Sequence, residues 1–156
     1  MSNAVTRLAC AAALAVPAPA AADAAVTLNC ATGATRVVML PSDNPTRPLP
    51  ANAGFATLPG MATAIKQGGT RNGCVIVYFS AGVVSGSAVS VRAVLDNVPA
   101  NPSSIHVFVS GGVPAADMTS FVFSSVAPGS HKIDIQYSST GTVEFADMHM
   151  IVNYAP

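Results

Sequence analysis

The stretch His131-Lys-Ile-Asp-Ile-Gln-Tyr137 alternates between two kinds of side chain. Its odd positions carry His, Ile, Ile and Tyr, whereas its even positions carry Lys, Asp and Gln. Because successive side chains of a β-strand point to opposite faces of the sheet, this alternation predicts a strand with one buried and one solvated face. We expect it to be an outer strand of an antiparallel sheet.

Strand-like segments recur along the chain, and no window beyond the first two dozen residues keeps a helical apolar stripe. Clusters of Gly, Pro, Asn and Ser separate them, as at 68–73, 97–102, 111–114, 127–130 and 138–141. Eight to ten short strands at this spacing predict an all-β, antiparallel β-sandwich of two sheets in one domain. The clearest strands are 74–79, 88–95, 105–109, 121–123, 131–137 and 143–154, and weaker candidates are 25–30, 36–40, 55–58 and 61–66.

Three segments carry further detail. Residues 74–79 are apolar on both faces, which predicts a strand that is central or covered by another subunit. The alternation in 143–154 changes phase near Asp147, and a β-bulge there would reconcile its two halves. Residues 41–54 contain four prolines and therefore cannot pair as a central strand, so we interpret them as a stiff loop or an edge-covering crossover.

The first 22 residues have the pattern of a secretory signal peptide. Arg7 precedes a run of nine apolar residues, Leu8 to Val16, and Ala20-Ala21-Ala22 offers a cleavage site. The run is about half the length of a membrane-spanning helix, and no later segment is longer, so we expect no transmembrane segment. The sequence thus predicts a signal peptide over 1–22, a single β-sandwich domain over 23–156, and a secreted or periplasmic location.

Charge is scarce in this chain. Only 14 of the 156 residues are Lys, Arg, Asp or Glu, at seven of each sign. Loss of residues 1–22 removes one basic residue and leaves six basic and seven acidic side chains. Binding to nucleic acid or to an acidic membrane surface needs a dense basic patch, so both classes of function are excluded. The apolar content of 51% excludes a disordered chain.

Removal of the leader changes the cysteine count from three to two. The remaining pair, Cys30 and Cys74, predicts a disulfide in an exported chain. Closing a loop of this length contributes about 4 kcal/mol in the chain-entropy model. The alternatives are two buried thiols or a metal pair, but cysteine-based metal sites use close spacings that this chain lacks.

Four segments resemble a group of uncharacterised bacterial secreted proteins built as a jelly roll. They are Leu58-Pro-Gly-Met61, Gly73-Cys-Val-Ile-Val-Tyr-Phe-Ser-Ala81, Pro128-Gly-Ser-His131 and the run from Gly141-Thr-Val143 to Val152-Asn-Tyr154. The strand count is also similar to that of complement-type and tumour-necrosis-factor-like jelly rolls, which implies trimeric assembly and ligand binding without catalysis. A second likeness, to secreted pilin-type subunits, is carried by the cysteine separation and a C-terminal tyrosine. None of these resemblances carries a functional residue over to this chain.

The candidate ligand-binding residues are three histidines and one aspartate: His106, His131, Asp147 and His149. Asp147 and His149 stand two apart and so point the same way on a strand, which is the one local hint of a metal site. The alternative is a histidine packed beside the core and hydrogen-bonded to Asp147 or to the backbone. His131 follows Pro-Gly-Ser, where a ring nitrogen would tie down the turn.

No catalytic residue, metal or cofactor is predicted. The leading interpretation is a secreted, non-enzymatic β-sandwich module with a structural, assembly or ligand-binding role at or outside the cell envelope. It predicts self-association as a homo-oligomer, or contact with a glycan or another envelope component. The alternatives are a carbohydrate-binding module using Tyr78, Tyr137 or Tyr154, a pilin-like subunit, and lastly a small hydrolase or metal-dependent enzyme.

Overall fold

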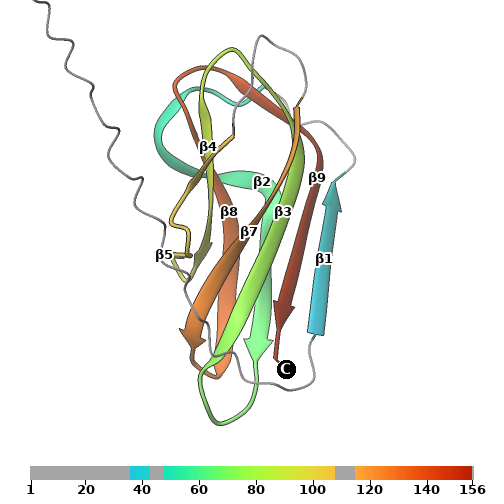
Figure 1. The fold of residues 1–156 in the computed structure, drawn as a ribbon, viewed down its shortest axis with the longest axis vertical. Helices are drawn as coiled ribbons and strands as arrows, with labels where there is room; N and C mark the ends of the chain where they lie inside the picture. Colours follow the sequence, from blue (N-terminus) through green and yellow to red (C-terminus); the bar gives the residue numbers. More distant parts are fainter. Residues whose placement is uncertain (1–35, 43–47, 108–114, 156) are drawn as a thin grey trace, which may run out of the picture.

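The computed structural model describes residues 36–42, 48–107 and 115–155, which fold into nine β-strands (Figure 1). The predicted signal peptide, the candidate strand 25–30, Cys30 and the last two residues of the candidate strand 105–109 lie outside the described residues. The strands are β1 (Arg36–Ser42), β2 (Asn52–Gln67), β3 (Gly73–Ser85), β4 (Val89–Leu95), β5 (Val98–Pro99), β6 (Ile105–Val107), β7 (Ala115–Val126), β8 (Gly129–Ser139) and β9 (Val143–Tyr154).

These strands form two antiparallel sheets that pack face to face. Sheet A has the order β1-β9-β3-β7, and sheet B has the order β2-β8-β4-β5, with β6 also paired to β4. From β1 to β4 the chain changes sheet at every step, and it does so again from β7 to β9, so that the first and last strands are neighbours. This alternation produces the jelly-roll-like sandwich that the sequence predicts.

The core lies between the sheets and is built from the inward positions of alternating strands. Tyr137 of sheet B and Phe145 of sheet A meet edge to face, with ring centroids 5.9 Å apart. Each fully buried large side chain contributes about 1.5–3 kcal/mol through the apolar area it removes from water. The largest fully buried side chains are Leu58, Met61, Phe121, Ile133, Ile135, Phe145, Met148 and Met150.

The central position of 74–79 is confirmed, whereas the outer position expected for 131–137 is wrong. Strand β3 lies between β9 and β7, and β8 lies between β2 and β4. The odd positions of β8 from 133 to 137 face the core as predicted. A solvated face does not make a strand an edge strand, because the outer face of a sandwich sheet is exposed for central strands as well.

The two weak candidates 55–58 and 61–66 are one strand, β2, interrupted in register rather than in chain direction. The pairing with β8 shifts between Thr57 and Ala62, where Gly60 adopts φ +79°. A residue without a Cβ takes this left-handed conformation at little cost, so the strand can bend and continue. The turn expected at 97–102 likewise contains the short strand β5.

The bulge predicted near Asp147 is confirmed. Ser80 pairs with His149 but Gly82 pairs with Ala146, which leaves one extra residue in β9. Asp147 itself has φ +48°. The extra residue reverses the inward set, so that Val143 and Phe145 precede the bulge and Met148, Met150, Val152 and Tyr154 follow it on the core side.

In the described residues of the proline-rich segment 41–54, the strands it contributes to are edge strands. Pro41 lies in β1 and residues 52–54 lie in β2, each of which has a neighbour on one side only in the described sheets. Between them Leu49 forms an isolated bridge with Val143. Both positions suit proline or its neighbours, because an edge strand can lack a ladder hydrogen bond.

Candidate functional site

The outer face of sheet A carries four of the five exposed large hydrophobic residues in the described part of the chain. Three rows of four residues cross β1, β9, β3 and β7 there, as the strand registers show. Directly paired residues of an antiparallel sheet point to the same side, so each row is a set of neighbouring side chains. The rows are Val37, Asn153, Ile76 and Val122; Met39, Ile151, Tyr78 and Ser120; and Pro41, His149, Ser80 and Met118.

Large apolar side chains on the edge strands of this face are open to solvent. Val37 is 60% exposed, Met39 58% and Met118 75%. Ile76, Val122 and Ile151 are half-buried between them. Four of the five most exposed large hydrophobic residues in the described part of the chain, including Tyr78, therefore belong to one face.

None of these twelve residues is Lys, Arg, Asp or Glu. The acidic residues on the same sheet are Asp117, which precedes Met118 in β7 and pairs with Ala81, Asp147 at the bulge, and Glu144, opposite Val84 toward the end of β9. A flat, apolar and uncharged sheet face is the kind of surface that proteins cover with another molecule.

The outer face of sheet B has a different chemistry, because it carries charged residues: Arg92, Lys132 and Asp134 have partners within the chain, and Lys66 is exposed on edge strand β2. Arg92 Nε donates to Gln136 Oε1 at 2.8 Å, and its guanidinium lies 4.0 Å from the centroid of the Phe55 ring. Lys132 Nζ lies 3.0 Å from Asp134 Oδ1. Three charged groups of this face thus have internal partners.

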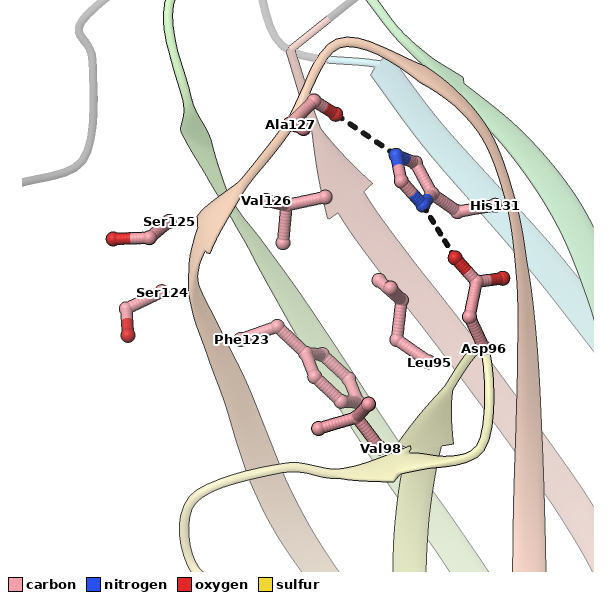
Figure 2. Close-up of a pocket in the computed structure, with 9 residues that line it drawn as sticks. All are labelled: Leu95, Asp96, Val98, Phe123, Ser124, Ser125, Val126, Ala127 and His131. Atoms are coloured by element: carbon pink, nitrogen blue, oxygen red, sulfur yellow. Dashed lines mark hydrogen bonds and ion pairs between the residues drawn. The ribbon is translucent and has the colours of Figure 1, made fainter.

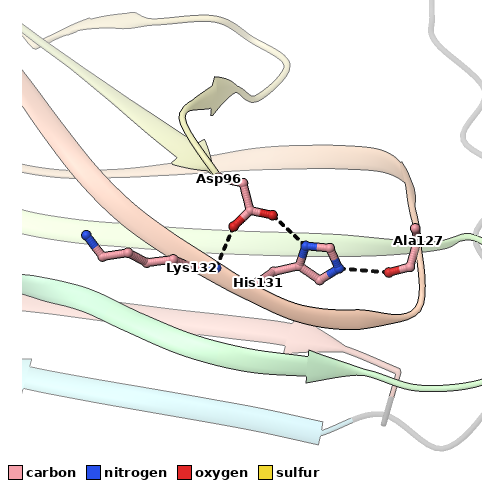
Figure 3. A network of polar contacts seen from close by, with 4 residues as sticks. All are labelled: Asp96, Ala127, His131 and Lys132. Atoms are coloured by element: carbon pink, nitrogen blue, oxygen red, sulfur yellow. Dashed lines mark hydrogen bonds and ion pairs between the residues drawn. The ribbon is translucent and has the colours of Figure 1, made fainter.

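A polar cluster at the β4–β5 turn joins three separate parts of the chain (Figure 3). Asp96 and Asn97 have φ of 50° and 69°, which is the two-residue type I′ turn that joins paired strands. From this turn Asp96 Oδ1 accepts a hydrogen bond from the backbone N–H of Lys132 at 2.8 Å, and Oδ2 accepts from His131 Nδ1 at 2.7 Å. His131 Nε2 donates to the carbonyl of Ala127 at 2.8 Å.

Both ring nitrogens of His131 thus face acceptors, which favours the imidazolium form. The pKa of His131 is raised, chiefly because its side chain hydrogen-bonds to the Asp96 carboxylate. The pKa of Asp96 is lowered, first by the hydrogen bond from the Lys132 backbone and then by the one from His131. A histidine whose two nitrogens are both engaged has no free lone pair for a metal or a substrate proton.

A cavity of about 240 Å³ opens beside this cluster, between the end of β7 and the β4–β5 turn (Figure 2). Its walls are Leu95, Val98, Phe123 and Val126, whereas the side chains of Ser124 and Ser125 point away from them. The polar groups at its rim are Asp96 and His131, which bond to one another. The cavity therefore has few free polar groups with which to orient a ligand.

The four candidate residues from the sequence are not brought together. His106 lies in β6 of sheet B, opposite Ser90, which pairs with Ser138. His131 lies seven residues from Ser138 along β8, which is about 23 Å of extended strand.

His149 and Asp147 lie in sheet A, on the opposite layer of the sandwich. Within residues 36–42, 48–107 and 115–155, no three His, Cys, Asp or Glu side chains gather as metal ligands would.

Sequence reasoning missed the functional weight of two features. Asp96 was left between the predicted strand 88–95 and the predicted turn 97–102, although the pair Asp-Asn between apolar runs is a type I′ turn signal. Met118 was not assigned to any strand, and Met39 was placed in a weak one without a face. Their alternation with inward neighbours only becomes meaningful once the pairing of β1 and β7 is known.

Two of the three tyrosines proposed as sugar-stacking platforms are buried. Tyr137 is 4% exposed and Tyr154 is 7% exposed, and the hydroxyl of Tyr137 lies 3.4 Å from the carbonyl of Pro50. Tyr78 is 36% exposed and stands in the middle row of the sheet A outer face.

The strand order defines the protein as a jelly-roll-like β-sandwich. No protein-family model matches its sequence, and no curated protein matches it. Among solved structures, the fold is similar to VP2 in the subviral particle of infectious bursal disease virus, with 14% identity, a TM-score of 0.54, and coverage of 90% of this chain and 37% of VP2.

Two further structures show lower similarity. The dimeric latent PorU of Porphyromonas gingivalis shares 11% identity at a TM-score of 0.47, over 76% of this chain and 12% of PorU. The sugar-binding EclA C-terminal domain shares 16% identity at a TM-score of 0.43, over 85% of this chain and 86% of that domain. The chain thus spans about an eighth of PorU and just over a third of VP2. None of the described residues forms a helix of the length and apolarity needed to cross a membrane.

Proposed function

We propose that this protein is an exported, non-enzymatic β-sandwich module that works by contact, as a subunit of an assembly at or outside the cell envelope. The observation that supports this most is the uncharged outer face of sheet A, on which Val37, Met39 and Met118 are each more than half exposed. Soluble monomers rarely keep such a patch open to water, because covering it is favourable by about 25 cal/mol per Å².

The state of His131 supports a non-enzymatic role. It is the one described histidine paired with a carboxylate, and its second nitrogen donates to the Ala127 carbonyl. A general base needs one unprotonated nitrogen directed at a substrate, and neither nitrogen meets this condition. We expect wild type and His131→Asn to be equally inactive on chromogenic ester, phosphate and glycoside substrates. Turnover by the wild-type protein that His131→Asn abolishes would contradict this proposal.

The proposal is tested by expressing the full chain with its own leader in a bacterial host and fractionating the cells. We expect a product that begins near residue 23, recovered from the periplasm or the medium, with a native mass above that of one chain. Mass spectrometry of the N-terminal peptide and light scattering after size exclusion give the two readings. A cytoplasmic, uncleaved product would contradict export, and a strict monomer that binds no envelope component would contradict assembly.

Carbohydrate binding is the second candidate, and the exposure of Tyr78 on a flat face favours it. A sugar ring stacks on an exposed aromatic ring, and Ser80 and Ser120 lie in the same or the next row to supply hydroxyls. A glycan array would show hits that Tyr78→Ala removes if this candidate is right. An array without hits would leave the assembly role alone.

A further inference from the structure

The sheet A outer face has the size and chemistry of a subunit interface. With strands about 4.8 Å apart and alternate residues about 6.8 Å apart, the three rows cover about 400 Å² in plan. Beyond them the face continues over Ala146, Gly82 and Val84, with Glu144 opposite Val84, and the three uncharged positions bring it to about 500 Å² in plan. Specific interfaces at the small end of the range bury about 600 Å² on each partner.

We propose that a second copy of this chain covers the sheet A outer face, and that the two copies form a two-fold symmetric dimer by packing sheet on sheet. This inference rests on the proposed assembly role and names its partner and surface. It concerns the three rows defined above, with Met39 and Met118 at their two edges.

The absence of charge from these rows favours a copy of the same chain as the occupant. In a symmetric dimer each row meets the same row, so any charge would face its own image or be buried without a counterion. The rows contain no Lys, Arg, Asp or Glu, and Glu144 lies beyond them toward the end of β9. A partner recognised by charge would find no complement on this face.

The order of the strands also makes the face complementary to itself. A two-fold axis parallel to the strands, running between β9 and β3, places β1 of one copy over β7 of the other and β9 over β3. Met39 then lies over Ser120 of the second copy, and Met118 lies over Pro41. Ile151 meets Tyr78. The large side chain of each edge strand therefore faces a smaller one.

Sheet B does not offer the same opportunity. Arg92, Lys132 and Asp134 on its outer face already have partners within the chain. Covering them would remove their water without adding a new bond, which costs free energy. The two faces thus predict opposite responses to the same substitution.

The test introduces one carboxylate on each face. Met39→Glu places a charge on edge strand β1 of sheet A, and Ala64→Glu is the matched control on edge strand β2, at an exposed position opposite Lys132. Sedimentation of the exported chain should give a wild-type dimer with a dissociation constant in the micromolar range. Met39→Glu should weaken it at least about a hundredfold, because two uncompensated charges are buried in each dimer, whereas Ala64→Glu should match the wild type. Met118→Glu should behave as Met39→Glu does.

Thermal unfolding of the dilute monomers confirms that the variants remain folded, since all three positions are exposed. Oxidative footprinting provides a reading without substitution: Met39 and Met118 should become protected as the concentration rises through the dissociation constant. Raising NaCl from 50 to 500 mM should leave the constant unchanged or tighten it, because no ion pair crosses this interface.

Three results would overturn the inference. These are a trimer or larger mass, equal weakening by Met39→Glu and Ala64→Glu, and protection of both methionines that does not depend on concentration. The last result would show that the chain's own remaining residues cover the face. An assembly that survives Met39→Glu refutes this interface but leaves the proposed function intact, whereas a protein that never associates with anything refutes both.

Discussion

The two outer faces of this sandwich are built from the same kind of strand but treat water differently. Sheet A presents Met39, Tyr78 and Met118 in rows that contain no Lys, Arg, Asp or Glu. Sheet B presents Arg92 and Lys132, each held by a partner from the adjacent part of the same sheet. The contrast is what supports our proposal that another molecule covers the outer face of sheet A, whereas that of sheet B faces solvent.

The largest expected effect comes from removing the core that both faces share. Phe145 is fully buried and packs edge to face on Tyr137 across the sandwich. Phe145→Ala should lower the free energy of unfolding by about 3–5 kcal/mol, because the cavity it leaves cannot fully collapse. Urea denaturation of the monomer measures the loss. Phe145→Leu is the control and should lose less than half as much; equal losses would show that the cavity volume does not set the cost.

The predicted disulfide at the border of the sheet A outer face should have the next largest effect. Cys74 lies in β3 one outward position before Ile76, and Cys30 lies outside the described residues. Cys74→Ser should lower stability by about 2–4 kcal/mol through the lost loop constraint. Reducing agent should destabilise the wild type by the same amount and leave the variant unchanged. Peptide mapping that finds both thiols free in the exported protein would contradict the pairing.

A smaller effect is expected from sheet B, and it should act on stability alone. Arg92→Ala removes both the hydrogen bond to Gln136 and the contact with the Phe55 ring. We expect a loss of about 1–2 kcal/mol in the unfolding free energy and an unchanged dimer dissociation constant. Met39→Glu should show the reverse pattern. If Arg92→Ala weakened association as strongly as it weakened folding, the distinction between the two faces would be lost.

The smallest effect should appear as a pH dependence at the β4–β5 turn. The raised pKa of His131 stabilises the folded state fully below its ordinary value of 6.5, and this contribution is lost as pH rises through the raised value. The lowered pKa of Asp96 stabilises it above 3.8 and is lost as pH falls through the lowered value. Stability from this pair should therefore be greatest between pH 4 and 6.5.

His131→Asn tests this dependence, since it cannot carry the charge. The difference in melting temperature between wild type and variant should be largest near pH 5 and should shrink toward pH 9. A constant difference across that range would mean that the ion pair contributes nothing and that only shape matters at this position.

Much of the fold follows from local pattern. Alternation in 131–137 marks its buried face, the apolar run 74–79 marks a covered strand, and the phase change near Asp147 marks the bulge, because each depends only on neighbours along the strand. The edge or central position of a strand does not have a local signal, which is why β8 was misplaced. The break within β2 also looked like a turn, since Gly60 supports either.

The candidate site was harder to predict because its members come from distant parts of the chain. Asp96 and His131 are 35 residues apart and meet only because β4 and β8 pair. Met39 and Met118 share a face only because β1 and β7 flank β9 and β3 in one sheet. An exposed methionine read alone is an ordinary surface residue.

The sequence by itself determined an all-β chain, the inward and outward residues of some of its strands, a shortage of charge, and the pattern of an exported protein. Only the tertiary structure decided which strands are neighbours, and hence that three rows without Lys, Arg, Asp or Glu form on the outer face of sheet A while Arg92 and Lys132 lie on that of sheet B. The physical reason is that alternation is a property of one extended backbone, whereas a surface is a property of registers between strands that lie far apart in the chain.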